Sequence, residues 1–193
     1  MPSALRATGL RIAGRLAALA GVVATLTLNL AAVALAGAPE APFGDKVSAA
    51  ITNYNRATPF VGTSGRYGAT AVAEVKELGF TTIVELRGPD EEGVAANAAA
   101  AKSAGLRYIA IPVTEKAPTE AQVQAFAQAV EDPANYPILV NCHSANRVGA
   151  MWALYRAQAG IPAEIAVEEG RTAGLTSREP TVRARLGLPP LSQ

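Results

Sequence analysis

The alternation of strand-length apolar runs with helix-like segments is the feature that most constrains the fold of this chain. Three apolar runs of strand length occur along the chain, at 80–86, 106–113 and 137–141. Segments with helical periodicity lie between and after them, at 90–105, 118–131, 148–160 and 162–174. Strands joined by helices of this length pair in parallel, in a sheet that is covered on both faces. The sequence therefore predicts an α/β fold, a three-layer sandwich around a mostly parallel sheet of four or five strands.

Weaker signals complete the predicted domain. The stretch 51–66 has β-branched and aromatic residues interrupted by proline and glycine, which predicts one or two short edge strands. The segment 69–79 has helical periodicity and ends at a glycine. Acids at 90–92 are placed in the first turn of the helix 90–105, as the helix dipole favours. Since no repeat or internal linker divides these elements, residues 51–193 are predicted to form one domain.

The first forty residues differ in kind from the rest. Arg6, Arg11 and Arg15 are followed by a stretch without charge that continues to Glu40 and contains small residues near its end. This pattern predicts a secretory signal peptide over 1–38, followed by a tether over 39–50. The expected location is periplasmic or secreted. The apolar stretch is long, so an uncleaved membrane anchor is the alternative, and contact with a membrane is expected only in that case.

Composition excludes several classes of function. Removal of residues 1–38 leaves 155 residues with 14 basic and 16 acidic side chains and no basic stripe, so nucleic acid is not an expected partner. The chain has one cysteine and one histidine, which rules out an internal disulfide and gives too few ligands for a zinc site. Neither a metal nor a cofactor is expected.

The segment NCHSANRVG contains that single cysteine, Cys142, at the end of the last predicted strand. Ligands of parallel sheets bind beyond the carboxyl ends of the strands. Backbone N–H groups and the positive end of the next helix favour a thiolate there. The planar guanidinium of Arg147 can hold two oxygens of a phosphate. The alternative is that Cys142 is a small core residue and Arg147 a surface residue.

The segment resembles the signature loop of cysteine-dependent phosphatases of the protein-tyrosine and dual-specificity superfamily. It is most similar to the short Cys-x4-Arg loop of phosphatase domains of the beta-lactamase-hydrolase-like-protein type. The segments 59–88, 104–114 and 139–156 follow that family's order and spacing, and the resemblance covers roughly residues 51–175. It implies a phosphatase-like fold and a phosphorylated protein or a small phosphoester as substrate.

The resemblance also implies roles for individual residues. Cys142 would form a phosphocysteine, and Glu115, where an aspartate is usual, would protonate the leaving oxygen. The phosphate would be bound by the loop of His143, Ser144, Ala145, Asn146 and Arg147.

The sequence departs from the usual pattern in four ways. Four residues rather than five separate the cysteine from the arginine, and Asn141 replaces the usual histidine before the cysteine. Val148 replaces the hydroxyl residue after the arginine, and the loop glycine is missing. Two alternatives therefore stay open: rhodanese-like sulfur transfer, which a smaller loop suits, and anion binding without catalysis. Arg87, after its strand, is expected to pair with Asp90 or Glu91.

Overall fold

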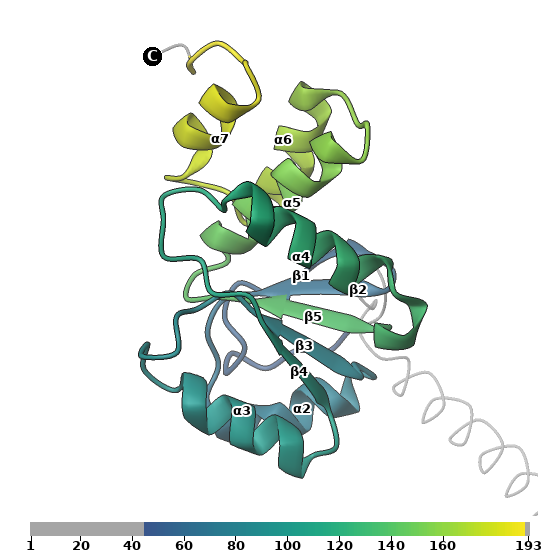
Figure 1. Ribbon diagram of the computed structural model, residues 1–193. Coiled ribbons are helices and arrows are strands. Elements are labelled where there is room, and N and C mark those ends of the chain that lie inside the picture. Colours follow the sequence, from purple (N-terminus) through teal and green to yellow (C-terminus); the bar gives the residue numbers. More distant parts are fainter. Residues whose placement is uncertain (1–44, 192–193) are drawn as a thin grey trace, which may run out of the picture. The chain divides into compact units, whose positions relative to one another are not determined.

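A five-stranded sheet forms the centre of the computed structural model, which describes residues 45–191 (Figure 1). The strands follow the order β1-β2-β5-β3-β4 across the sheet. The β1–β2 pairing is antiparallel, and the other three pairings are parallel. Their bounds are β1 Asn55–Thr58, β2 Val61–Ser64, β3 Thr82–Glu85, β4 Arg107–Ala110 and β5 Ile138–Asn141.

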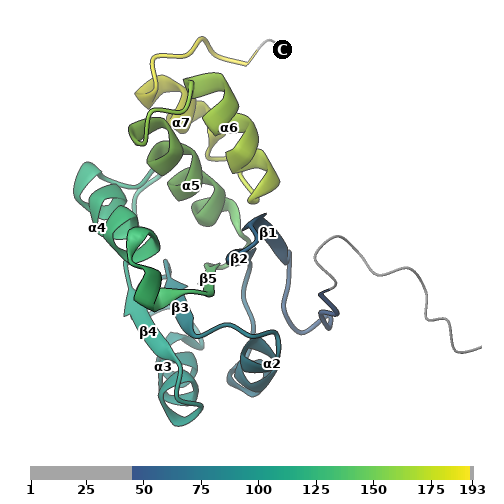
Figure 2. The same ribbon diagram turned by 90° about the vertical axis from the view of Figure 1, so that its right-hand side faces the viewer.

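Helices cover both faces of this sheet, as Figure 2 shows with the sheet nearly edge-on. On one face lie the 3-10 turn η2 (Ala69–Ala71), α2 (Val72–Glu77) and α3 (Val94–Ser103). On the other face lie α4 (Glu120–Glu131) and α5 (Asn146–Gln158), with the 3-10 turn η3 (Pro133–Asn135) leading from α4 towards β5. The last two helices, α6 (Ala163–Thr172) and α7 (Glu179–Arg185), pack against α5. The predicted three-layer α/β sandwich is confirmed.

Side chains on the two faces of the sheet belong to two separate apolar cores. Along β5, Val140 faces the core that includes Phe126 of α4 and Trp152 of α5. Leu139 faces the other core, which includes Val75 of α2. Because the central strand is buried on both faces, it reads as a continuous apolar run rather than an alternating one.

Strand register brings three strand ends to one edge of the sheet. Asn141 of β5 pairs in register with Ser64 of β2 and with Glu85 of β3. The chain leaves each of these strands in the same direction, since the pairings are parallel. The loops that begin at residues 65, 86 and 142 are therefore neighbours.

Three details differ from the sequence predictions. Of the two strands in 51–66, only β1 lies at the edge, because β2 pairs with both β1 and β5. The helix expected from residue 90 begins at Val94, after a left-handed Gly93, so its three acids precede the first turn. The short helix α7, whose one buried apolar residue is Val182, is not among the predicted elements. Ion pairs such as Arg183–Glu164 attach it to α6.

The first described residues lie against the domain. The Asp45 carboxylate accepts hydrogen bonds from Arg56, at 2.5 and 2.9 Å, and from the Tyr54 hydroxyl at 2.7 Å. Residues 45–50 of the expected tether are thus attached, whereas 39–44 and the expected leader over 1–38 lie outside the described residues. Among helices within 45–191, none combines the length and apolar character needed to cross a membrane.

Candidate active site

Cys142 follows the last residue of β5 and lies at the base of the loop that leads into α5. Its N–H donates to the carbonyl of Ser64 at 3.3 Å. The residue is 1% exposed and borders the apolar core beside Val148. Burial of this degree fits a core residue as well as a nucleophile at the bottom of a binding loop. The loop around the thiol is what distinguishes the two.

The segment after β2 forms hydrogen bonds with the first residues of this loop, His143 and Ser144. Gly65 and Ser144 form an isolated antiparallel bridge. The N–H of Arg66 donates to the carbonyl of His143 at 3.0 Å, and the Asn53 amide donates to the carbonyl of Ser144 at 3.2 Å. The carbonyls of the loop are therefore turned outwards, towards neighbouring segments.

The connection between α6 and α7 contacts the later residues of the loop, Ala145 and Asn146. Asn146 accepts a hydrogen bond from the N–H of Thr176 at 2.9 Å and donates to the Ser177 hydroxyl at 2.7 Å. Ala145 has φ 65°, a left-handed conformation that usually belongs to glycine. A Cβ on Gly174 would lie 2.5 Å from the Ala145 Cβ. Glycine at position 174 therefore leaves room for the alanine that stands in the loop where a glycine is usual.

Backbone N–H groups of the loop are available to a ligand. Between residues 45 and 191, no acceptor is found for the N–H groups of His143, Asn146 and Arg147. Asn146 and Arg147 are also the first two residues of α5, a helix of 13 residues. Free N–H groups at the start of a helix of this length, together with its dipole, form an anion-binding site.

Arg147 is oriented by two acceptors. Its Nη1 and Nη2 donate to the two carboxylate oxygens of Glu91 at 2.5 and 2.7 Å, and Nη1 also donates to the carbonyl of Val113 at 3.2 Å. A guanidinium has five N–H groups, and these contacts use three of them. The second N–H of Nη2 and the N–H of Nε remain, and they lie on one edge of the planar group. That edge can bind two oxygens of an anion.

Arg147 and Glu91 stabilise each other's charged forms. The hydrogen bond to Glu91 raises the pKa of Arg147, burial opposes this shift, and interaction with Cys142 adds to it. The same hydrogen bond is the main reason that the pKa of Glu91 falls to about 2, and the N–H of Gly88 contributes as well. The pair is thus ionised throughout the physiological range.

The role of Glu91 could not be assigned from the sequence, where it looks like an acid at the start of a helix. The signal that could have identified it is its position after β3, which lies next to β5 in the sheet. The expected pairing of Arg87 with Asp90 or Glu91 is wrong. Arg87 binds the buried carboxylate of Glu85, at 2.7 and 2.9 Å, because residues two apart in an extended chain project to the same side.

Asn141 also contacts this buried carboxylate. Its amide donates to Glu85 at 3.0 Å, and Tyr67 lies within 3.5 Å of its carbonyl oxygen. The residue in the place of the usual histidine is therefore part of a buried polar network beneath the loop.

Glu115 lies in the exposed loop between β4 and α4. Its carboxylate accepts hydrogen bonds from the Thr114 N–H at 3.2 Å and from the Gln122 amide at 3.3 Å. Its own N–H is the largest cause that lowers the pKa of this carboxyl, followed by Gln122. The Arg178 side chain, whose pKa is lowered by burial and then by Arg147, donates to the carbonyl of Glu115. These contacts bring the Glu115 loop to the side of the site where Arg147 lies.

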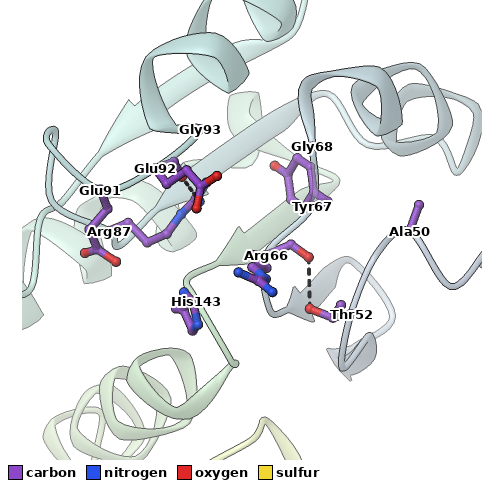
Figure 3. Close-up of a pocket in the computed structure, with 10 residues that line it drawn as sticks. All are labelled: Ala50, Thr52, Arg66, Tyr67, Gly68, Arg87, Glu91, Glu92, Gly93 and His143. Carbon is purple, nitrogen blue, oxygen red and sulfur yellow. Dashed lines mark hydrogen bonds between the residues drawn. The ribbon is translucent and has the colours of Figure 1, made fainter.

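A pocket of about 570 Å³ adjoins the loop at His143 (Figure 3). Arg66 and Tyr67 line it from the segment after β2, and Arg87 and Glu91 from the segment after β3. Among the residues that the structure describes, no group of three or more His, Cys, Asp or Glu side chains could hold a metal ion.

Comparisons with known proteins agree with this geometry. A family model described as "DSP-PTPase phosphatase fused to NAD+ Kinase" matches residues 48–183. A beta-lactamase hydrolase-like protein of Xylella fastidiosa is 38% identical over 95 residues. The match covers 47% of this chain but only 22% of that longer protein.

Solved structures show the same fold. A DUF442 protein from Shewanella putrefaciens superposes with a TM-score of 0.59 at 22% identity, over 71% of this chain and 90% of that one. TpbA of P. aeruginosa, solved in complex with pTyr, gives a TM-score of 0.50 at 22% identity, over 74% and 94% of the two chains. The family match favours phosphate-ester chemistry over the rhodanese-like alternative.

Proposed function

Because this chain belongs to the DSP-PTPase phosphatase family, a family of phosphomonoester hydrolases, we propose that it hydrolyses phosphomonoesters through a phosphocysteine at Cys142. The observation that carries the proposal is the loop itself. The loop that follows the thiol has unpaired N–H groups at His143, Asn146 and Arg147, and the Arg147 guanidinium has a free edge. These donors suit the charge that develops on the transferred phosphoryl group.

The reaction has two steps. The Cys142 thiolate attacks phosphorus, the ester P–O bond breaks, and the leaving oxygen takes a proton from Glu115. Water then attacks the phosphocysteine and gives its proton to the Glu115 carboxylate, which releases phosphate and regenerates the thiolate. Arg147 binds two oxygens of the phosphoryl group in both steps.

Two variants test the nucleophile and the anion site separately. Cys142→Ser is expected to abolish release of phosphate from an aryl phosphate while phosphate binding persists, since the N–H groups and Arg147 remain. Arg147→Lys is expected to impair both, because an ammonium cannot reproduce the two-pronged contact. Iodoacetate should alkylate Cys142 in the folded protein, and vanadate should protect it. Alkylation that occurs only after unfolding, with normal activity of Cys142→Ser, would show that Cys142 is a buried core residue without a catalytic role.

Glu115 as general acid requires a separate test. Glu115→Gln is expected to lower the rate far more for a poor leaving group than for an activated aryl phosphate, which needs little protonation. Since its own N–H and the Gln122 amide lower the pKa of this carboxyl, the protonated acid is scarcer at neutral pH, and the rate with poor leaving groups should rise as the pH falls. Equal losses on both substrates would exclude the role.

The proposed substrates are a phosphorylated protein or a small phosphoester. The complex of TpbA with pTyr supports the first class, because that protein shares the fold.

We also propose export to the periplasm, because the chain begins with a basic and then apolar segment that resembles a signal peptide. N-terminal sequencing of the mature protein is expected to start near Gly37 or Pro39. An intact leader in the membrane fraction would show an anchored protein instead.

A further inference from the structure

The pocket beside the loop has no part in the two-step reaction, yet it is next to the reacting group. His143, the residue after Cys142, lines it together with Arg66, and Figure 3 shows these two side chains on the same side of the pocket. Its volume of about 570 Å³ is in the range of sites that hold small molecules. Any group attached to a phosphate in the loop has this space within reach.

The backbone of Arg66 is hydrogen-bonded to the loop and to Thr52. Its N–H donates to the His143 carbonyl at 3.0 Å, and its carbonyl accepts hydrogen bonds from the Thr52 N–H at 3.3 Å and the Thr52 hydroxyl at 2.9 Å. A Cβ on the preceding Gly65 would lie 2.5 Å from the Thr52 hydroxyl, which shows how closely the segments approach. The exposed Arg66 side chain therefore extends from a backbone that is anchored on both sides.

The charges around the pocket single out the same residue. Arg87 is neutralised by Glu85, and Arg147 by Glu91. Within residues 45–191, neither the Arg66 guanidinium nor the His143 imidazole has a hydrogen-bond or ion-pair partner. These two side chains therefore offer unused N–H donors to the pocket, and Arg66 adds an uncompensated positive charge.

We propose that this pocket binds a second anionic group of the substrate, a phosphate or a carboxylate, through Arg66 and His143. The inference rests on the proposed function, since the scissile phosphate must occupy the loop. The preferred substrates are then compact small-molecule phosphomonoesters with a second negative group close to the first. Glu92, an exposed carboxylate that also lines the pocket, opposes a second anion by its like charge and supplies a test of the opposite sign.

Binding to Cys142→Ser, measured by calorimetry, tests the site without turnover. The probes are phenyl phosphate and benzene 1,3-bisphosphate, with 3-carboxyphenyl phosphate to tell a carboxylate from a phosphate. The bisphosphate is expected to bind at least about tenfold more tightly than the monophosphate, well beyond the statistical factor of about two for two equivalent groups, since hydrogen bonds to charged groups are the strong ones.

Single substitutions then show which residues cause the preference for the bisphosphate. Adding Arg66→Gln should lower the ratio of bisphosphate to monophosphate affinity roughly tenfold, and Glu92→Gln should raise it about two- to threefold. Lys102→Gln, which removes an exposed charge on α3 outside the pocket, is the matched control and should leave the ratio unchanged. The ratio of kcat/KM values in the protein with Cys142 intact should follow the same order.

An affinity ratio near two, or one that Arg66→Gln leaves as it is, would overturn the proposal. A phosphotyrosine peptide with an acidic neighbour that alone shows the Arg66-dependent gain would overturn it in favour of a peptide substrate. Absence of turnover with all probes, with the Arg66-dependent binding intact, would refute the proposed hydrolysis and retain the second anion site.

Discussion

Glu91→Gln is the substitution for which the structure allows the most complete prediction. The change removes the carboxylate charge that Arg147 contacts at 2.5 and 2.7 Å but keeps the size of the side chain. A pKa lowered from 4.5 to about 2 corresponds to roughly 3.4 kcal/mol at 1.36 kcal/mol per unit. Because the Glu91 side chain is 34% exposed, solvent screens the pair, and we expect a loss of about 1–2 kcal/mol in the free energy of unfolding at pH 7.

The pH dependence of this loss has a definite sign. The pKa of Glu91 is lower in the folded state than in the unfolded state, so its contribution is complete above pH 4.5 and disappears as the pH falls towards 2. Urea unfolding of the two proteins should therefore differ by about 1–2 kcal/mol at pH 7 and by less than half of that at pH 3. Glu92→Gln is the control, with an expected effect below about 0.5 kcal/mol.

The same variant distinguishes two effects of Glu91 on ligand binding. If Glu91 orients Arg147, phosphate or vanadate should bind roughly tenfold more weakly to Glu91→Gln, since the free edge of the guanidinium is no longer directed at the loop. Tighter binding would show that Glu91 competes with the anion, and an unchanged stability difference between pH 7 and pH 3 would refute the electrostatic account.

Two further predictions concern glycines that allow close packing. Gly149→Ala should cost about 2–3 kcal/mol in urea unfolding, because its Cβ would lie 2.1 Å from the Leu175 nitrogen and 2.5 Å from the Gly170 carbonyl, so that α5 and α6 must separate. Gly174→Ala should cost at least about 2 kcal/mol, since Gly174 has φ 111° and its new Cβ would meet that of Ala145. Ala145→Gly should recover part of that loss in a double-mutant cycle, and strictly additive effects would contradict the contact.

Local patterns in the sequence identified most of the fold, and the reason is physical. The strand expected at 137–141 and the helix after it are found as β5 and α5, because an apolar run of this length and a following helical period have few other arrangements. The position of Cys142 at the sheet edge follows from the same pattern. What could not be predicted depends on contacts between distant residues. Glu91 and Arg147 are 56 positions apart, and no local feature links them.

Two other differences have causes that are partly visible in the sequence. Arg87 pairs with Glu85, two residues before it, and the alternation of a strand could have indicated this. The helix α7 has seven residues and a single buried apolar side chain, Val182, and ion pairs such as Arg171–Glu179 add to its attachment, so a search for hydrophobic periodicity misses it.

Cys142 is the only thiol in the chain, and this has a consequence for oxidation. A thiolate in the binding loop reacts with peroxide to form a sulfenic acid, which many enzymes convert to a disulfide with a second cysteine before further oxidation occurs. This chain has no such resolving thiol, so recovery needs a small thiol or a partner protein. Export, as proposed, would place the protein where such reductants are scarce. The time for which the enzyme stays active would then depend on how much of that time phosphate or substrate occupies the loop and shields the sulfur from the oxidant.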